Sequence, residues 1–492
     1  MEQLSAQLTH IAEYILLLAP EIMLAVGFVL CILADIFFPQ AKAAWPSVLV
    51  LFLALLGAAY CLYTPFVPWQ SQAVLEGMLW ADTFSVFFRS LIIGAGFLAL
   101  GQWLLSAEAR KGAGRGEQLA LLLAALLGLE MMVLAGNFLL LYLGIELVSV
   151  AAYILMIFRF SPKAAAASIK YLLFGALSSG LMLYGISFFY GLSGTLSFAQ
   201  SGFIEAIAQA EPFLVFLALL LVLAGLLFKV SAVPFHVWSP EVYQHAPTHW
   251  LGFFSVAPKI AGVAVLWRFS QIFQDFTFAP VEGWTFSWAA LLAVLALASI
   301  LLGNLAALSQ QNAKAMMAFS GIAQAGFMLI LVALGSAFAL QGLRAYLGVY
   351  MLMNFLAFTL IQTVETYQQE ATMQEYTGLG KVQPLWGILF LIVMLSLVGL
   401  PPLAGFMTKL LLFSALWEAY SLQGQAFWLW LFVIGLLNTA VGLFYYLKIP
   451  YYWFFGQSES HLPLKISKAQ YWYCGILAAL LLVFFVKIDW WF

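Results

Sequence analysis

The chain has 492 residues, of which 65% are hydrophobic and only 8% are charged, and its formal net charge is −2. A soluble domain carries about 25% charged residues, so this chain must present apolar side chains to something other than water. A mean hydropathy of +1.01 is typical of a protein whose surface faces lipid. Such a hydrophobic composition excludes a secreted enzyme and a disordered chain. It also excludes a nucleic-acid-binding protein, because no basic field exists to attract phosphate groups.

Apolar runs of about 20 residues, the length that crosses a membrane as a helix, recur along the whole chain. They are long and lack an alternation of period two, which excludes an outer-membrane β-barrel. We therefore predict an all-α polytopic membrane protein with fourteen spans, whose ends are placed to within about four residues. The spans are 14–38, 45–64, 82–105, 117–135, 137–160, 164–190, 212–233, 249–273, 285–308, 313–335, 341–364, 384–420 (interrupted), 425–455 and 470–488.

The first apolar run is preceded by acidic rather than basic residues, and it is too long for the core of a cleavable signal peptide. The cysteines Cys31, Cys61 and Cys474 lie far apart in apolar stretches. Because they form no CxxC pair, they indicate neither a disulfide framework nor a zinc site. We expect them to be small packing residues.

Basic residues are concentrated in the loops after odd-numbered spans, namely Lys42, Arg110, Lys111, Arg115, Lys163, Lys314, Lys381, Lys465 and Lys468. The loops after even-numbered spans and the two termini carry almost only Arg268 and Lys487. The positive-inside rule then places the basic loops in the cytoplasm and both termini on the outer side. The glycine-rich segment 111–116 lacks the GK[ST] ending of a phosphate loop and is interpreted as a linker.

Ionisable residues inside the spans are the most informative, because each costs about 2.5–3.5 kcal/mol to insert into lipid. The clear cases are Glu146, Lys170, Lys229, Lys259 and Lys409, while Arg89 and Glu130 are less clear. Burial favours a neutral lysine and a nearby carboxylate favours a charged one, so a lysine with a mobile partner can relay protons. The alternative is a static ion pair that joins two helices. One acid among four lysines favours the relay.

Two of these lysines end the same motif, A-G-x-x-x-K, at Lys229 and Lys409, which are 180 residues apart. Prolines close to both, at Pro234 and 401–402, are expected to break the helices. Interrupted spans at matching positions of two halves indicate inverted repeats with the functional site at the breaks. Lys259 also follows a proline, so a kink is expected there.

Three histidines surround the turn between the seventh and eighth spans. For His236 two interpretations stay open: a group that feeds or gates a proton relay, or a satisfied histidine at the membrane interface. His245 and His249 are expected to be satisfied packing residues, and the spacing does not indicate zinc. Tyr445 and Tyr446 are expected to be interface anchors. The sequence contains no dinucleotide fingerprint, iron–sulfur cysteine cluster or paired haem histidines, so we expect no redox centre in this chain.

Six segments carry recognisable motifs: GIEL (144–147), SIKY (168–171), FKVSAVPFHVW (228–238), PEVYQ (240–244), GNLAALSQ (303–310) followed by Lys314, and residues 396–409. In combination they resemble the N-subunit family of bacterial NADH:quinone oxidoreductase, respiratory complex I, the counterpart of mitochondrial subunit 2. The resemblance covers roughly residues 80–455, and the combination of motifs is highly specific. Subunit L should be longer, with a lateral helix, and subunit M usually carries glutamate in place of Lys409, so both points favour N.

The resemblance implies an antiporter-like fold with two inverted five-helix repeats, formed by spans 4–8 and 9–13, in which helices 7 and 12 are broken. It divides the chain into an N-terminal three-helix segment (1–110), a first repeat (111–275), a second repeat (276–460) and a last span (461–492).

The resemblance also implies roles for the residues of a proton relay. Glu146 and Lys229 match the acid and the lysine of the input half, Lys259 the central lysine and Lys409 the exit-half lysine. Lys170 matches a further lysine of the family in span 6, and His236 matches a histidine that follows the break in span 7.

Two positions depart from the pattern of the family. Related sequences often carry a histidine in span 10 where this chain has Gln324. Either water bridges that part of the path, or the histidine is not essential. Glu130 has no partner in the expected pattern.

The implied function is a proton-translocating membrane-arm subunit of complex I in the bacterial plasma (inner) membrane, driven by quinone reduction elsewhere in the complex. As such it would belong to a translocase without doing redox chemistry itself. NADH, FMN, iron–sulfur clusters and quinone are expected in other subunits, and no cofactor or metal in this chain. The expected partners are the L-, M-, K-, J-, A- and H-type subunits and the lipid bilayer, with no nucleic acid. The alternatives are a subunit of a multi-subunit Na⁺/H⁺ antiporter and a non-pumping scaffold.

Overall fold

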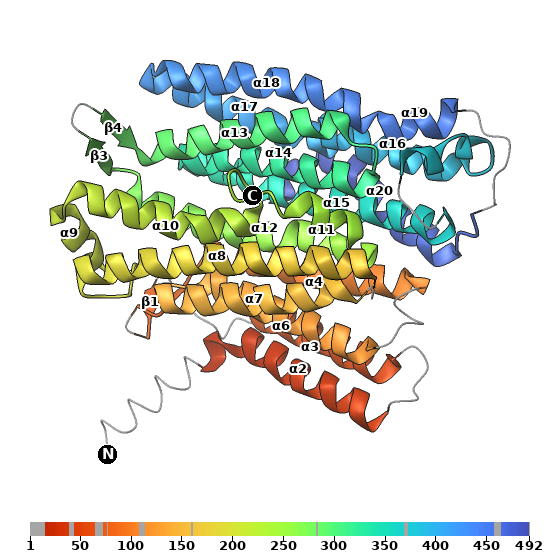
Figure 1. The fold of residues 1–492 in the computed structure, drawn as a ribbon, viewed down its shortest axis with the longest axis horizontal. Coiled ribbons are helices and arrows are strands. Elements are labelled where there is room, and N and C mark those ends of the chain that lie inside the picture. Colours follow the sequence, from red (N-terminus) through yellow and green to blue (C-terminus); the bar gives the residue numbers. More distant parts are fainter. Residues whose placement is uncertain are drawn as a thin grey trace.

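A computed structural model describes nine stretches of the chain: 15–38, 44–63, 72–75, 77–107, 114–158, 161–281, 284–368, 372–456 and 464–491. These stretches are almost entirely helical, and the long helices run side by side as one bundle (Figure 1). Lys42, Arg110 and Lys111, which contributed to the predicted orientation, lie outside the described residues.

Within the described ranges, 13 helices are long and apolar enough to cross a membrane. In chain order they are α2 (Ala19–Phe37), α3 (Trp45–Leu62), α4 (Thr83–Leu105), α6 (Arg115–Leu134), α7 (Phe138–Ile157), α8 (Pro162–Ser193), α10 (Pro212–Val230), α12 (Thr248–Phe273), α13 (Trp288–Ser309), α14 (Ala313–Leu334), α15 (Ala337–Gln368), α18 (Ala426–Tyr446) and α20 (Lys468–Val486). The interrupted span is the pair α16 (Pro384–Val398) and α17 (Ala404–Gln423). The predicted all-α fold with its order of spans is confirmed.

Short elements between these helices were not predicted from the sequence. The strands β1 (Gln72–Val74) and β2 (Leu79–Ala81) form one antiparallel hairpin, and β3 (Thr277–Val281) and β4 (Trp284–Ser287) form another. The short helices are α9 (Ser201–Gln209), α11 (Ser239–His245), α19 (Lys448–Phe455), η2 (Met373–Tyr376), η3 (Leu379–Lys381) and η4 (Ile488–Trp491). Figure 1 places β1, β3, β4 and α9 at one end of the bundle and α19 at the other.

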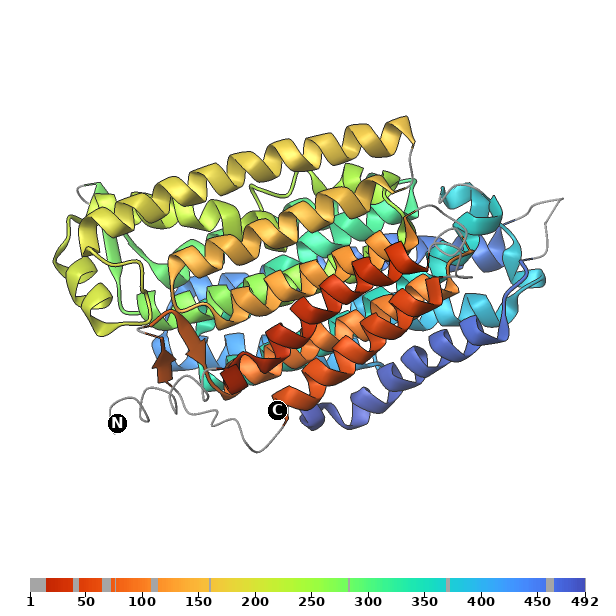
Figure 2. The same ribbon diagram turned by 90° about the horizontal axis from the view of Figure 1, so that it is seen from below.

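The helices differ strongly in how much of their surface is covered. The apolar windows of α12 and α15 are completely buried, whereas those of α2, α18 and α20 are less than one-third buried. Figure 2 shows α2, α3 and α20 on the side of the molecule that faces the viewer. The polar residues of α12 and α15 are therefore enclosed by protein, and the outer helices present apolar side chains to their surroundings.

Both predicted helix breaks are present. The helix α10 ends at Val230, Ser231 takes a left-handed conformation with a φ of 57°, and irregular backbone leads to α11. The helix α16 ends at Val398, Gly399 has a φ of 90°, and α17 begins five residues later, at Ala404. Such breaks free backbone carbonyl groups that need other donors, and they are tolerated at membrane depth only inside protein or beside water.

The close contact between α6 and α7 depends on two glycines. A Cβ atom added at Gly128 would lie 2.8 Å from the carbonyl oxygen of Gly144, and one added at Gly144 would lie 2.8 Å from the carbonyl oxygen of Gly128. The two backbones therefore touch at this point, as small residues allow in membrane helices. This contact sets the position of α7, which carries Glu146.

We predict that Gly128→Val separates α6 from α7 and lowers the free energy of unfolding by about 1–3 kcal/mol, because the added atoms have no space. Thermal unfolding of the full chain in lipid nanodiscs measures the change. The matched control is Gly180→Val on α8, where an added Cβ meets nothing within 4 Å. Equal stability of the two variants would contradict the role of this contact.

Candidate functional site: a buried lysine axis

Three of the predicted lysines, Lys229, Lys259 and Lys409, are buried at the centre of the bundle, and together we call them the lysine axis. Lys229 on α10 is 4% exposed, Lys259 on α12 is 1% exposed and Lys409 on α17 is 7% exposed. Each ammonium group is held by protein oxygen atoms, as a charge enclosed by apolar helices requires. The expectation that these three lysines lie inside the protein is confirmed, whereas their role in a relay stays a prediction.

Lys229 lies in the last turn of α10, immediately before the break. Its Nζ donates a hydrogen bond of 2.6 Å to Ser149 Oγ on α7. Glu146 lies one turn earlier on α7, close enough for its charge to act on Lys229. Its Oε1 is buried and has no hydrogen-bond partner among the described residues. Lys229 therefore donates to the hydroxyl of Ser149 and not to the carboxylate of Glu146, which was the predicted partner. Glu146 lies nearby without a direct hydrogen bond to Lys229.

Lys259 follows Pro258, which lies inside α12. Its Nζ donates to the carbonyl oxygen of Gly321 at 2.6 Å and to the hydroxyl of Tyr350 at 3.2 Å. Neither acceptor is a carboxylate. A Cβ atom at Gly321 would lie only 2.8 Å from Nζ, so the glycine makes room for the ammonium group.

Lys409 is held by the end of the broken helix. Its Nζ donates to the carbonyl oxygens of Val398 at 2.6 Å and Leu397 at 3.3 Å, in the last turn of α16. These carbonyls have no partner within the helix, and the C-terminal end of a helix carries partial negative charge. The break between α16 and α17 therefore supplies the acceptors that this lysine needs.

A chain of polar groups reaches Lys409 from the side of α14. Gln324 Nε2 donates to the Leu397 carbonyl oxygen at 3.3 Å, the same oxygen that Lys409 contacts, and to the hydroxyl of Tyr446 at 3.1 Å. Gln324 Oε1 accepts a hydrogen bond from the hydroxyl of Tyr346. The position at which the family resemblance suggested a histidine is thus occupied by a glutamine whose amide nitrogen and oxygen are both hydrogen-bonded.

The hydroxyl of Tyr446 joins this glutamine to Ser320, with which it shares a further hydrogen bond. Ser320 is followed in α14 by Gly321, whose carbonyl oxygen accepts from Lys259. Side-chain and backbone groups of α14 therefore connect the surroundings of Lys259 with those of Lys409.

The prediction that Tyr445 and Tyr446 are interface anchors is wrong. Both side chains are 1% exposed, and Tyr445 donates a hydrogen bond of 2.9 Å to Asn304 Oδ1 on α13. This end of α18 packs against α13 and α14, so both hydroxyls find partners inside the protein rather than at the membrane surface.

Lys170 differs from the other three lysines. Its side chain is 53% exposed, and its Nζ contacts both carboxylate oxygens of Glu241 on α11, at 2.6 and 2.7 Å. The expectation that Lys170 is buried is therefore wrong for this chain, because its side of α8 faces outward. Glu241 belongs to the PEVYQ motif, and its pairing with Lys170 was not predicted from the sequence.

His236 lies in the irregular backbone between α10 and α11 and is half-buried. Its Nδ1 has no hydrogen-bond partner among the described residues. Both interpretations of this histidine therefore stay open. His249 is 3% exposed, and its Nδ1 lies 3.5 Å from Ser106 Oγ, as expected for a packing histidine.

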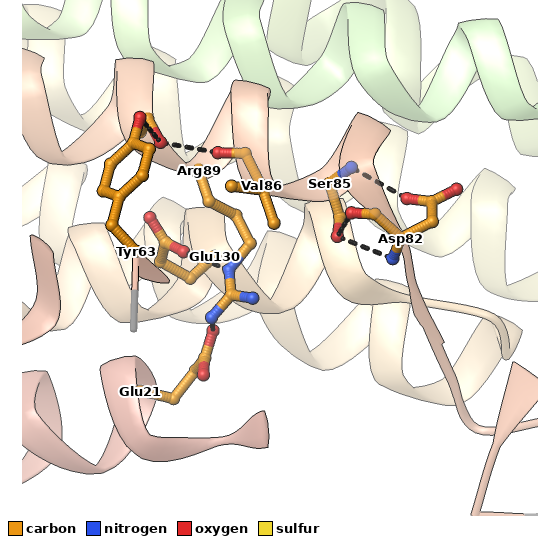
Figure 3. Close-up of polar contacts among 8 residues, drawn as sticks. Glu21, Tyr63, Asp82, Ser85, Val86, Arg89 and Glu130 are labelled. Carbon is orange, nitrogen blue, oxygen red and sulfur yellow. Dashed lines mark hydrogen bonds and ion pairs between the residues drawn. The ribbon is translucent and has the colours of Figure 1, made fainter. Parts of the chain in front are cut away.

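Two buried ionic clusters were missed or only partly foreseen. Lys314, which was predicted to lie in a loop, is buried in the first turn of α14 and binds Glu365 on α15 at 2.8 Å. Glu130, for which the expected family pattern offered no partner, binds Arg89 on α4, and Arg89 also binds Glu21 on α2 (Figure 3). The available signal was an acid within or beside an apolar span.

A cavity of about 650 Å³ lies between α17 and α18 and reaches Lys409. Its lining is mostly apolar, and it includes Trp417 and Glu418, which are exposed on the side of the molecule. Lys409 therefore lies beside an opening to the lateral surface.

Comparison with known proteins assigns the family. The family model described as "NADH:quinone oxidoreductase/Mrp antiporter, TM" matches residues 135–437. NADH-quinone oxidoreductase subunit N of Anaeromyxobacter sp. (strain Fw109-5) is 37% identical over 87% of this chain and 85% of its own length.

Solved structures are similar to this chain over nearly its whole length. A chain of respiratory complex I from Thermus thermophilus with bound aureothin superposes with a TM-score of 0.74 at 31% identity, covering 95% of this chain and 97% of that chain. A chain of the Mrp complex from Dietzia sp. DQ12-45-1b has a TM-score of 0.77 at 22% identity, over 97% and 95% of the two chains, which shows a shared fold. The chain therefore belongs to the NADH-quinone oxidoreductase subunit N family, as its sequence motifs predicted.

Proposed function

We propose that this chain is a proton-translocating membrane-arm subunit of an NADH:quinone oxidoreductase, in which Lys229, Lys259 and Lys409 relay protons at mid-membrane depth. The observation that carries the proposal is the nature of their acceptors. Each ammonium group is bonded to hydroxyl or carbonyl oxygens and not directly to a carboxylate. Because these acceptors are neutral, the hydrogen-bond partners that remain when a lysine loses its proton carry no charge.

The input step uses Glu146 and Lys229. Moving a unit charge to about 5 Å from another changes the energy by about 3 kcal/mol at an effective dielectric constant of 20. This corresponds to about a hundredfold change in proton affinity. A small movement of α7 against α10, driven by quinone reduction elsewhere in the complex, would therefore load or unload Lys229.

The central and exit steps use the groups around α14. A Cβ at Gly262, one turn after Lys259, would lie 3.8 Å from Lys229 Cβ, so α10 and α12 meet beside both lysines. From Lys259 the route passes Ser320, Tyr446 and Gln324 to Lys409. Gln324 carries no imidazole, so the hydroxyl of Tyr446 and water would bridge this part of the path.

Membership of the family supports a proposal for the wider setting of the chain. We place the chain in the bacterial inner membrane with both termini on the outer side, among the L-, M-, K-, J-, A- and H-type subunits of the membrane arm. FMN, the iron–sulfur clusters and the NADH and quinone sites would lie in other subunits of the complex. The breaks in α10 and between α16 and α17 support the division into repeats at 111–275 and 276–460. Lys170 with Glu241, and His236, are candidate accessory groups of the input half.

We predict that Lys229→Ala lowers both NADH-driven quinone reduction and proton pumping by at least about tenfold, because the input group is lost. The measurement uses inverted membrane vesicles after assembly has been checked, with and without Na⁺. The control is Lys487→Ala, which removes an exposed lysine. Normal rates in Lys229→Ala would support a scaffold, and a Na⁺-dependent gradient would support an antiporter.

We predict that Tyr446→Phe lowers proton pumping by about tenfold, which corresponds to about 1.4 kcal/mol, the size of one lost hydrogen bond. The ring stays in place, but the hydroxyl between Ser320 and Gln324 is removed. Tyr471→Phe is the matched control, because its hydroxyl donates to Gln383 Oε1 and not to a group of the proposed route. If both variants pump normally, the exit route does not use Tyr446.

A further inference from the structure

A second buried charge cluster lies among the N-terminal helices, apart from the lysine axis (Figure 3). Arg89 Nη2 contacts Glu21 Oε1 at 2.5 Å, and Arg89 Nε contacts Glu130 Oε2 at 2.7 Å. The side chains of Arg89 and Glu130 are 0% exposed, and that of Glu21 is 8% exposed. Three helices, α2, α4 and α6, each contribute one member.

The cluster contains two carboxyl groups and one guanidinium group. If both acids were ionised, it would carry one net negative charge. Glu21 Oε2 and Glu130 Oε1 are buried and have no hydrogen-bond partner among the described residues. Burying an ionised carboxylate costs far more than burying a neutral one, and two carboxylates that share a site do not ionise together easily.

Among the described residues, no other cation is placed to compensate the second acid. On α3, Cys61 interacts electrostatically with Glu21 and brings no positive charge. The cations on the helices packed against α4 and α6 have other partners. Arg268 binds Asp82, Lys259 donates to the carbonyl oxygen of Gly321, and Arg344 stacks on Phe87. The acid Glu146 lies on α7, away from the cluster. A proton is the simplest group that balances the cluster.

We propose that Glu21 and Glu130 share one exchangeable proton beside Arg89, which makes this cluster a proton-binding site outside the lysine axis. When the proton is bound, one acid is neutral and the other forms the ion pair with the arginine. When it leaves, the charge of the N-terminal helices changes by one unit.

The position of the cluster defines the side from which its proton comes. Arg89 is the seventh residue of α4 and Glu21 the third of α2, so the cluster lies about 10 Å from the start of α4. This end of the bundle carries the β1–β2 hairpin (Figure 1). Glu130 is two residues beyond Gly128, about 200° around α6, and so faces away from α7. The site therefore exchanges its proton with the β1–β2 side.

The test is infrared spectroscopy of the full chain in lipid nanodiscs, which detects the C=O stretching band of a protonated carboxyl group. The variants are Glu130→Gln and Glu21→Gln, each of which replaces one acid by an amide of the same shape. We expect the wild-type chain to show such a band at neutral pH, and either single variant to lose it. The reason is that the remaining acid then forms the ion pair with Arg89 and ionises.

The matched control is Glu117→Gln, an exposed acid in the first turn of α6, which should leave the band unchanged. A wild-type chain without the band, or variants that both keep it, would show that the two acids are ionised. Loss in one variant only would assign the proton to a single acid and overturn the sharing. A Glu130→Gln chain that fails to fold also contradicts the proposal, because the amide should replace a protonated carboxyl group.

Discussion

Polar groups at the centre of this bundle need partners in the protein or in enclosed water, because the bilayer offers none. This constraint explains where the helices break. Val398 and Leu397 end α16 with free carbonyl groups, and Lys409 donates to both of them. Ser149 on α7 and the carbonyl of Gly321 serve Lys229 and Lys259 in the same way. Irregular backbone with unpaired carbonyl groups would be energetically costly in contact with lipid, but here it supplies acceptors for the buried lysines.

The hydrogen-bond acceptor of each buried cation determines whether that cation can release its proton or forms a fixed ion pair. Lys314 binds the carboxylate of Glu365 at 2.8 Å, and that pair joins α14 to α15. Breaking such a buried pair leaves an uncompensated charge, which makes it a structural link. The three lysines of the axis have neutral acceptors instead, so the loss of a proton is less costly. Arg89 shows a third arrangement, in which one cation serves two acids and a proton balances the excess.

Much of the fold could be predicted from local features of the sequence. Runs of about 20 apolar residues gave the spans, and prolines beside Lys229 and Lys409 gave the breaks. Contacts between helices could not be predicted, because they join residues far apart in the chain. Glu130 meets Arg89 across 41 residues and Lys170 meets Glu241 across 71. Tyr446 was misplaced for the same reason, since the partner of its hydroxyl is Ser320 on another helix.

The most direct test of the central claim concerns Lys259, the middle lysine of the axis. The measurement is the number of protons pumped per electron by the complex reconstituted in proteoliposomes, with Lys259→Met compared with the wild type. Methionine keeps much of the volume but cannot carry a proton. The proposed relay predicts that this ratio falls while the complex still assembles. An unchanged ratio and rate would show that protons do not pass through Lys259.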